Sequence, residues 1–406
     1  MKRERPGGAD ADPGMVDDAE KLAGLVDRIS GQPAIAVDTE FHGEKRYWPE
    51  LFLVQVADCR GPAVLDPLAL EDLDPLAAVM ADPNTVKVIH SAANDIGIIN
   101  REVGGPLANV FDTQLAAAFL GYGQQCSLGK LLRKVCGISP KKRFSLSDWS
   151  SRPLARKQVD YALDDVRWLL DLYGKLRDRL EHSGRLAWFE SEARDLCDPD
   201  RYGVDLEKVF RRVRSSGKLK KRSLPVLWAL VRWREERAME SDRPRKRILR
   251  DFQLARIAGM APRDRESLNT LRGIPSGFLE KHGDAVLQVV AEALEDPPDD
   301  VPPPPSHPRS RRGSPARRDM LRIFLNREAE RLGIAKPLLL PKAAQRSLAA
   351  DPPRNMEDLR RVEGMTGWRA DLLGESILRM FQGRLALVLD PSAKGGMDFV
   401  EREGGQ

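Results

Sequence analysis

Cysteine is scarce in this sequence, and no two cysteines form a pair. Four cysteines are scattered over 406 residues, and none of them belongs to a CxxC motif. The spacing therefore indicates neither a zinc ribbon nor a disulfide framework, and it is typical of a protein from a reducing compartment. The four residues are Cys59, Cys126, Cys136 and Cys197.

Long apolar runs are also missing. No run approaches the roughly 20 residues that a membrane span needs, and the first residues, MKRERPGGADADPG, lack the apolar stretch of a secretory signal. We therefore expect a cytoplasmic protein with no membrane partner. The hydrophobic content of 41% is nevertheless sufficient for packed cores, which excludes a wholly disordered chain. The length predicts two or three domains.

The formal net charge of +5 conceals an uneven distribution of charge. Residues 201–260 contain 18 Lys and Arg against 7 Asp and Glu, a net charge of +11, so the remainder of the chain carries −6. A smaller basic stretch covers residues 309–331. Such segregation indicates one part that binds a polyanion and another that needs carboxylates, although a solvated basic helix face would give the same count.

Short β-rich runs precede helical patterns in the first half of the chain. This order predicts a mixed α/β domain over about residues 20–200. The expected strands are residues 34–37, 51–57 and 86–89, and the expected helices include residues 115–120, 128–135 and 159–180.

The second half of the chain is predicted to be helical. Two helical segments resemble each other at a constant offset of 91 residues, as in Pro262 and Pro353, or Gly273 and Gly364. Seven such matches without a gap indicate a duplicated small helical domain. The Pro-rich residues 297–315 between the segments predict a linker.

Acidic residues follow the first apolar run. Asp38 and Glu40 are two positions apart, so in an extended strand both carboxylates point to the same face. Two carboxylates on an apolar strand are unfavourable unless a cation neutralises them. The alternative is that the strand ends at residue 37 and that both side chains are solvated.

Two further acidic positions are candidates for the same chemistry. Tyr161 and Asp165 are four residues apart in a helical pattern, which places both on one helix face. Asp95 follows the run VKVIH, where it also fits a helix N-terminus. His90, at the end of that run, is either a packing side chain or a group that lines a site.

Together, Asp38, Glu40, Asp95, Tyr161 and Asp165 resemble the active-site pattern of the DEDDy 3′-5′ exonuclease superfamily. The longer motifs YxPxLFLVQVA, FDTQLAAAFLG and SDWSSRPLARKQVDYALDDV are similar to those of the bacterial ribonuclease D family, and the segment after residue 215 resembles an HRDC domain. The resemblance implies an α/β RNase H-like exonuclease domain, with a mixed central sheet and flanking helices, followed by two all-α HRDC-type helical bundles.

The resemblance also implies domain boundaries. They are a flexible tail over residues 1–18, an exonuclease domain over 19–210, a first HRDC domain over 215–296, the linker over 297–315, a second HRDC-like domain over 316–390 and a flexible tail over 391–406.

The implied reaction is hydrolysis of RNA from its 3′ end to nucleoside 5′-monophosphates, in the maturation of precursor tRNA. Asp38, Glu40, Asp95 and Asp165 would hold two divalent cations, Mg²⁺ or Mn²⁺, because hard cations prefer oxygen ligands. Two such cations about 4 Å apart can activate a water and stabilise the leaving oxygen. Tyr161 would orient the attacking water, since a phenol with a pKa near 10 is a poor base at neutral pH.

The expected partner is RNA with a single-stranded 3′ end, and the sequence implies no protein partner. A basic segment of this kind can follow a phosphate backbone. The residues assigned to substrate binding are Gln55, His90, Lys142, Lys220, Lys221, Arg222, Arg245, Lys246 and Arg247.

Two alternatives stay open at this stage. A DNA exonuclease of the same superfamily would have the same active-site residues, whereas a non-catalytic RNA-binding scaffold would be expected to have lost at least one of them.

Overall fold

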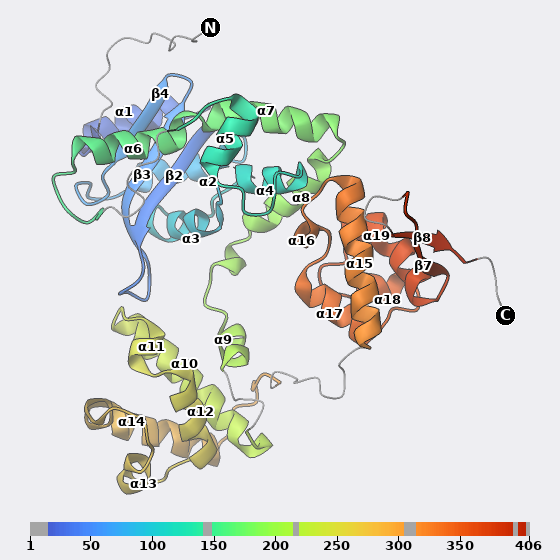
Figure 1. Cartoon of the computed structure of the whole chain (residues 1–406). Helices are drawn as coiled ribbons and strands as arrows, with labels where there is room; N and C mark the ends of the chain where they lie inside the picture. Colours follow the sequence, from blue (N-terminus) through green and yellow to red (C-terminus); the bar gives the residue numbers. More distant parts are fainter. Residues whose placement is uncertain (1–14, 141–147, 214–218, 304–313, 393–396, 403–406) are drawn as a thin grey trace. The chain divides into compact units, whose positions relative to one another are not determined.

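The computed structural model describes residues 15–140, 148–213, 219–303, 314–392 and 397–402 (Figure 1). The described residues form two compact units. The first contains the chain through Thr39, Leu53–Arg201 and the residues from 314 onward. The second contains residues 202–303 together with Glu40–Phe52, the segment that joins two strands of the sheet.

Within the described residues, six strands form a sheet of mixed direction in the order β1-β4-β3-β2-β5-β6. Strands β3 and β4 pair antiparallel, whereas β1 with β4, β2 with β5 and β5 with β6 pair parallel. The predicted mixed α/β domain is thus confirmed, although β1, β4 and β6 were not predicted. The strands are β1 Met15–Val16, β2 Ala34–His42, β3 Glu50–Asp58, β4 Gly61–Leu65, β5 Val86–Ile89 and β6 Val110–Asp112.

Strand β2 is longer than the apolar run that predicted it. It continues through His42, so Asp38 and Glu40 lie inside the strand and not beyond its end. The alternating burial of this part shows why the apolar pattern breaks off early: Thr39 is buried, whereas both acids are half-buried on the other face.

Helices flank this sheet (Figure 1). Helix α6 packs against β4, α7 against β5 and α8 against β6. In α1, apolar residues recur at helical spacing on the buried face, and the Asp18 carboxylate accepts the Lys21 backbone N–H at 2.8 Å to cap the helix. The helices are α1 Ala19–Ile29, α2 Asp74–Ala81, α3 Ala93–Glu102, α4 Thr113–Phe119, α5 Leu128–Cys136, α6 Arg156–Arg167, α7 Leu169–His182 and α8 Leu186–Leu196.

Two helical bundles follow, and their helices confirm the duplication. Residues Leu224 and Pro315 begin corresponding helices 91 residues apart, as do Asp251 and Lys342. The first bundle consists of α9 Leu206–Arg212, α10 Leu224–Glu240, α11 Arg245–Ile248, α12 Asp251–Met260, α13 Arg265–Asn269 and α14 Ser276–Glu295. The second consists of α15 Pro315–Leu332, α16 Lys336–Leu339, α17 Lys342–Ala350, α18 Met356–Arg360 and α19 Trp368–Phe381.

The expected flexible tails are partly wrong. Strand β7 (Leu385–Leu389) pairs antiparallel with β8 (Met397–Glu401), so the chain after residue 391 includes an ordered strand. The second HRDC-like domain was predicted to be all-α over residues 316–390, so β7 is a departure from that prediction. Near the other end, Met15–Val16 pair with β4, and residues 1–14 lie outside the described residues.

The second bundle is packed into the same unit as the sheet. The Trp368 indole, at the start of α19, stacks on Trp188 of α8 with ring centroids 5.1 Å apart and donates its N–H to Glu192 at 3.0 Å. Arg369 donates to both oxygens of Glu192, at 2.6 and 2.8 Å.

Gly121 also contacts the second bundle. It has a φ of +79°, and a Cβ there would lie 2.6 Å from the Gly333 carbonyl oxygen. The close approach therefore requires glycine.

In the described parts of the chain, none of the helices has the length and apolar character of a membrane-spanning segment.

Candidate active site

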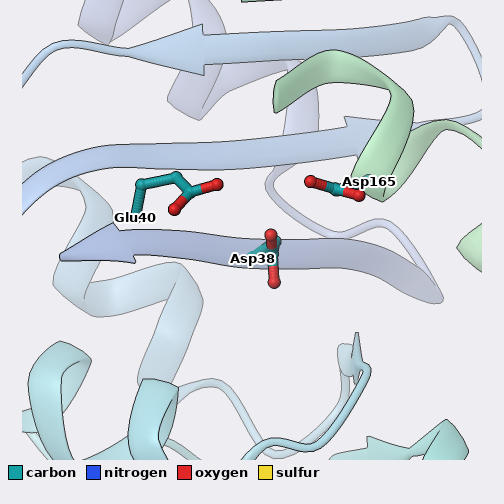
Figure 2. Close-up of side chains that lie close together, drawn as sticks. All are labelled: Asp38, Glu40 and Asp165. Atoms are coloured by element: carbon teal, nitrogen blue, oxygen red, sulfur yellow. The ribbon is translucent and has the colours of Figure 1, made fainter. Parts of the chain in front are cut away.

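Three carboxylates from two elements meet above the sheet. Alternation along β2 places Asp38 and Glu40 on one face, and α6 carries Asp165 to the same place. Among the described residues, these three form the acidic group that could hold a metal ion, with one oxygen of each within 4.8 Å of the others. Figure 2 shows the Asp165 carboxylate directed from its helix toward the strand that bears the other two.

Tyr161 lies one helical turn before Asp165 in α6. Its side chain forms a hydrogen bond with Asp165, which places the phenol beside the acidic group. The Tyr161 ring stacks on buried Trp149, with centroids 6.3 Å apart. The packing restricts the ring to a narrow range of positions. Trp149 is therefore a core side chain that supports the tyrosine and not an exposed stacking platform.

The electrostatics of the pocket fit a bound cation. Burial raises the pKa of Asp165 to about 7, the neighbouring Asp164 carboxylate adds to the rise, and the hydrogen bond from Tyr161 opposes it. Both raising causes disfavour the ionised form of Asp165 when no positive charge is nearby. A divalent cation among three carboxylates would remove that penalty, and carboxylate oxygens are the ligands that Mg²⁺ and Mn²⁺ prefer. The residues present therefore fit a divalent metal.

Asp95 is not part of this group of three. Its side chain is buried in the first turn of α3 and accepts a hydrogen bond from the Thr39 hydroxyl at 2.5 Å. Burial raises the pKa of Asp95 to about 6, against the lowering effect of the Thr39 hydrogen bond.

Asp112 is a residue that the sequence reasoning missed. Its Oδ1 accepts the backbone N–H groups of Gln114 at 2.7 Å and Leu115 at 3.3 Å, which caps α4. Oδ1 also accepts the N–H of Ser91 and Oδ2 that of Ala92, both at 3.0 Å. One buried carboxylate thereby fixes the start of α4 and the turn that enters α3, where Asp95 lies. Its position between an apolar run and a helical pattern is a helix-cap signal in the sequence.

An ion pair between Arg152 and Asp66 connects the segment that precedes α6 to the residue that follows β4. Arg152 donates to both oxygens of buried Asp66, at 2.5 and 2.7 Å, and to the Trp149 carbonyl at 2.7 Å. Bidentate pairs of this kind restrict geometry more than single contacts do. The sequence offered no signal for this pair, since 86 positions separate the two residues.

Gln55 and His90 were both assigned to substrate binding. The Gln55 side chain is buried, and the His90 side chain is half-buried. Gln55 has an exposed fraction of 0%, and neither of its amide atoms has a hydrogen-bond partner among the described residues. The His90 Nδ1 lies 2.8 Å from the Thr113 hydroxyl, and burial lowers the pKa of His90.

The basic residues predicted to bind RNA differ in how far their side chains are exposed. Arg245 contacts the Glu235 carboxylate at 3.1 Å and lies over the Tyr47 ring, and its side chain is half-exposed. The others that the structure describes have exposed side chains, whereas Lys142 lies outside the described residues. The exposed residues are Lys220, Lys221, Arg222, Lys246 and Arg247.

The segment that joins β2 to β3 belongs to the second unit. The Tyr47 hydroxyl donates to buried Glu235 at 2.8 Å, and Asp242 accepts the Tyr47 backbone N–H at 3.1 Å. Arg46 contacts Asp242 at 3.3 Å. These contacts hold the segment that follows Glu40 against the first bundle.

If Tyr161 orients an attacking water, as the family resemblance implies, its replacement by phenylalanine should reduce kcat for hydrolysis of an RNA strand about a hundredfold with little change in KM. Steady-state kinetics measures both constants. Tyr173→Phe, which removes a hydroxyl from neighbouring α7, is the control and should leave kcat unchanged. An unchanged kcat in Tyr161→Phe would exclude the positioning role.

Comparison with known proteins gives a consistent result over most of the chain. A family model described as 3′-5′ exonuclease matches residues 13–181, and the HRDC domain model matches residues 223–290 and 315–380. Ribonuclease D of Acidiphilium cryptum is 38% identical over 385 residues, covering 94% of this chain and 96% of that protein. Ribonuclease D of Granulibacter bethesdensis is 37% identical, with 93% and 95% covered.

A solved structure is similar as well. The crystal structure of Escherichia coli RNase D, described as an exoribonuclease involved in structured RNA processing, matches with a TM-score of 0.78 and 29% identity. The match covers 91% of this chain and 98% of that one.

Proposed function

Because the chain belongs to the ribonuclease D family and is a 3′-5′ exoribonuclease, we propose that it trims the 3′ ends of precursor tRNA with two Mg²⁺ or Mn²⁺ ions. The observation that carries the proposal is the convergence of Asp38, Glu40 and Asp165, beside Tyr161, in a chain that aligns with a ribonuclease D over 94% of its length. The same relatives favour RNA over DNA as substrate and an active enzyme over a scaffold.

We assign metal binding to the three clustered carboxylates and to Asp95. Two divalent ions would supply activation of the attacking water and neutralisation of the charge on the leaving 3′ oxygen. Asp38, Glu40 and Asp165 would hold them, since each presents a carboxylate oxygen to the same point. Asp95 accepts a hydrogen bond from Thr39, the residue between the two acids of β2, and this contact connects it to the strand that bears Asp38 and Glu40.

Tyr161 would supply orientation. Its ring is fixed by Trp149 and its hydroxyl lies next to Asp165, so it can hold a water in line with the scissile phosphorus. Holding a reactant in one geometry lowers the entropic part of the barrier. RNA would approach with a free, single-stranded 3′ end, and each cycle would release one nucleoside 5′-monophosphate.

Precursor tRNA is proposed because the similar E. coli protein is described as acting in structured RNA processing, and precursor tRNA is a structured RNA with a 3′ trailer. Exposed basic residues on the first bundle, among them Lys220, Lys221 and Arg222, could contact its backbone. We place this activity in the cytoplasm.

A time course on a precursor tRNA with a 3′ trailer tests the proposal. We expect a ladder of single-nucleotide steps in the presence of Mg²⁺ or Mn²⁺ that stops near the mature end, and no ladder in EDTA. A DNA strand of matched sequence is the control for sugar preference. Products that retain a 3′ phosphate, equal cleavage of DNA, or digestion that continues through the mature tRNA would each contradict the proposal.

A further inference from the structure

The duplication offers an internal comparison, because the two bundles share one backbone plan but differ in chemistry on one face. In the first bundle, α12 and the turn after α13 place Phe252, Arg256 and Arg272 around Gly273. The positions 91 residues later, in α17 and the turn after α18, hold Ala343, Ser347 and Glu363. All six side chains are exposed.

The three residues of the first bundle lie together. A Cβ built on Gly273 would meet the Phe252 ring at 3.4 Å and the Arg256 guanidinium at 3.7 Å. Arg256 donates a hydrogen bond to the carbonyl of Arg272. Gly273 has a φ of +85°, as does its counterpart Gly364, so the turn requires glycine in both bundles. In the first bundle the missing side chain also leaves the ring uncovered.

The fold of the bundle does not require an aromatic ring and two arginines at these positions. The exposed fraction of Phe252 is 43%, which places a large apolar ring in water, whereas alanine occupies the same position of the second bundle. Arg256 and Arg272 form no ion pair within the described residues, and only one guanidinium N–H of Arg256 is used. The nearby acid Asp251 is neutralised by buried Arg234 at 2.8 Å.

We propose that Phe252, Arg256 and Arg272 form a binding site for single-stranded RNA, with a base stacked on the Phe252 ring and phosphates bound by the two arginines. The proposal rests on the function proposed above, in which RNA is the substrate. Stacking needs an unpaired base, because the faces of paired bases inside a duplex are covered by their neighbours. Exposed Arg250, Lys246 and Arg247 extend the positive charge along α11 and the start of α12.

Binding of a 5′-labelled oligoadenylate of about twelve nucleotides to the full chain, measured by fluorescence anisotropy in EDTA, tests the site. Phe252→Ala, which introduces the residue of the second bundle, should weaken binding about tenfold or more without changing the salt dependence. Arg256→Gln should reduce the slope of log K against log salt by about 0.7. Phe252→Trp should restore binding, since indole also stacks.

Leu294→Ala is the matched control, because Leu294 is an apolar residue of the same bundle with a similar exposed fraction, 41%. It should bind like the unaltered chain. Affinity of Phe252→Ala within about twofold of the unaltered chain, or an equal loss of affinity for a blunt RNA duplex, would overturn the site. Binding is measured without hydrolysis, so failure of the site and failure of the proposed activity give different results. If the site is wrong, Phe252→Ala binds RNA as tightly as the unaltered chain. If only the proposed activity is wrong, affinity still depends on Phe252 but the unaltered chain releases no nucleotides.

Discussion

Replacement of Asp38 by alanine is expected to reduce RNA hydrolysis at least about a thousandfold, because the loss of a proposed metal ligand would remove several kcal/mol of transition-state stabilisation and each ~1.4 kcal/mol is a factor of ten in rate. Asp38 lies on β2 with Glu40, and one of its carboxylate oxygens is within 4.8 Å of an oxygen of both Glu40 and Asp165 (Figure 2). Single-turnover release of nucleoside monophosphates, with Mg²⁺ or Mn²⁺ in excess, measures the loss.

RNA affinity should stay within about twofold in the same variant, since the proposed contacts with the RNA backbone come from the basic first bundle. Asp160→Asn is the matched control. Asp160 is an exposed acid of α6, next to Tyr161, and pairs with Arg156 at 3.2 Å. Its replacement should leave the rate unchanged. Metal-dependent trimming that survives Asp38→Ala would rule out the metal assignment.

The sequence predicted those parts of the site that depend on local spacing. Two acids at positions i and i+2 must share a strand face, and a tyrosine and an acid at i and i+4 must share a helix face. The structure places Asp38 with Glu40 on β2, and Tyr161 with Asp165 on α6, in these arrangements. Their convergence on one point was implied by family resemblance, because spacing within one element carries no information about a distant one.

What the sequence did not predict depends on packing between elements. Thr39, the residue between the two acids of β2, was not predicted to have a role, yet its hydroxyl donates a hydrogen bond to Asp95. Arg245 was assigned to RNA from charge alone, but its guanidinium is engaged by Glu235, a buried acid on α10. In each case the local pattern identified the residue type, whereas its contact with a residue of another element could not be read from that pattern.

The two bundles also differ in what local sequence could and could not predict. Their constant offset predicted corresponding helices, and five helices of each bundle begin at positions 91 or 92 residues apart. It did not predict that Trp368 and Arg369 of the second bundle would be bonded to Glu192 of α8. The second copy is thus packed against the helices of the sheet, while the first copy retains the exposed basic residues.

Replacement of Asp112 by alanine should lower the stability of the first unit by about 3–4 kcal/mol. Four backbone N–H groups, those of Ser91, Ala92, Gln114 and Leu115, lose their acceptor at once. The exposed fraction of Asp112 is only 7%, so water cannot readily replace the carboxylate. Urea titration followed by tryptophan fluorescence, together with calorimetry to separate the transitions of the two units, measures the effect.

Activity should fall with stability in this variant, because the bonds to Ser91 and Ala92 fix the entry to α3 and thereby the position of Asp95. Asp112→Asn keeps the Oδ1 acceptor and should recover the α4 cap but not the bond from Ala92, so it should lie between the alanine variant and the unaltered chain in both stability and rate. Asp18→Ala, which removes a single exposed cap bond from α1, is the control and should lower stability less and leave the rate unchanged. If Asp112→Ala instead lowered stability no more than Asp18→Ala does, the carboxylate would not be the common anchor of α3 and α4, and Asp95 would have to be held by Thr39 alone.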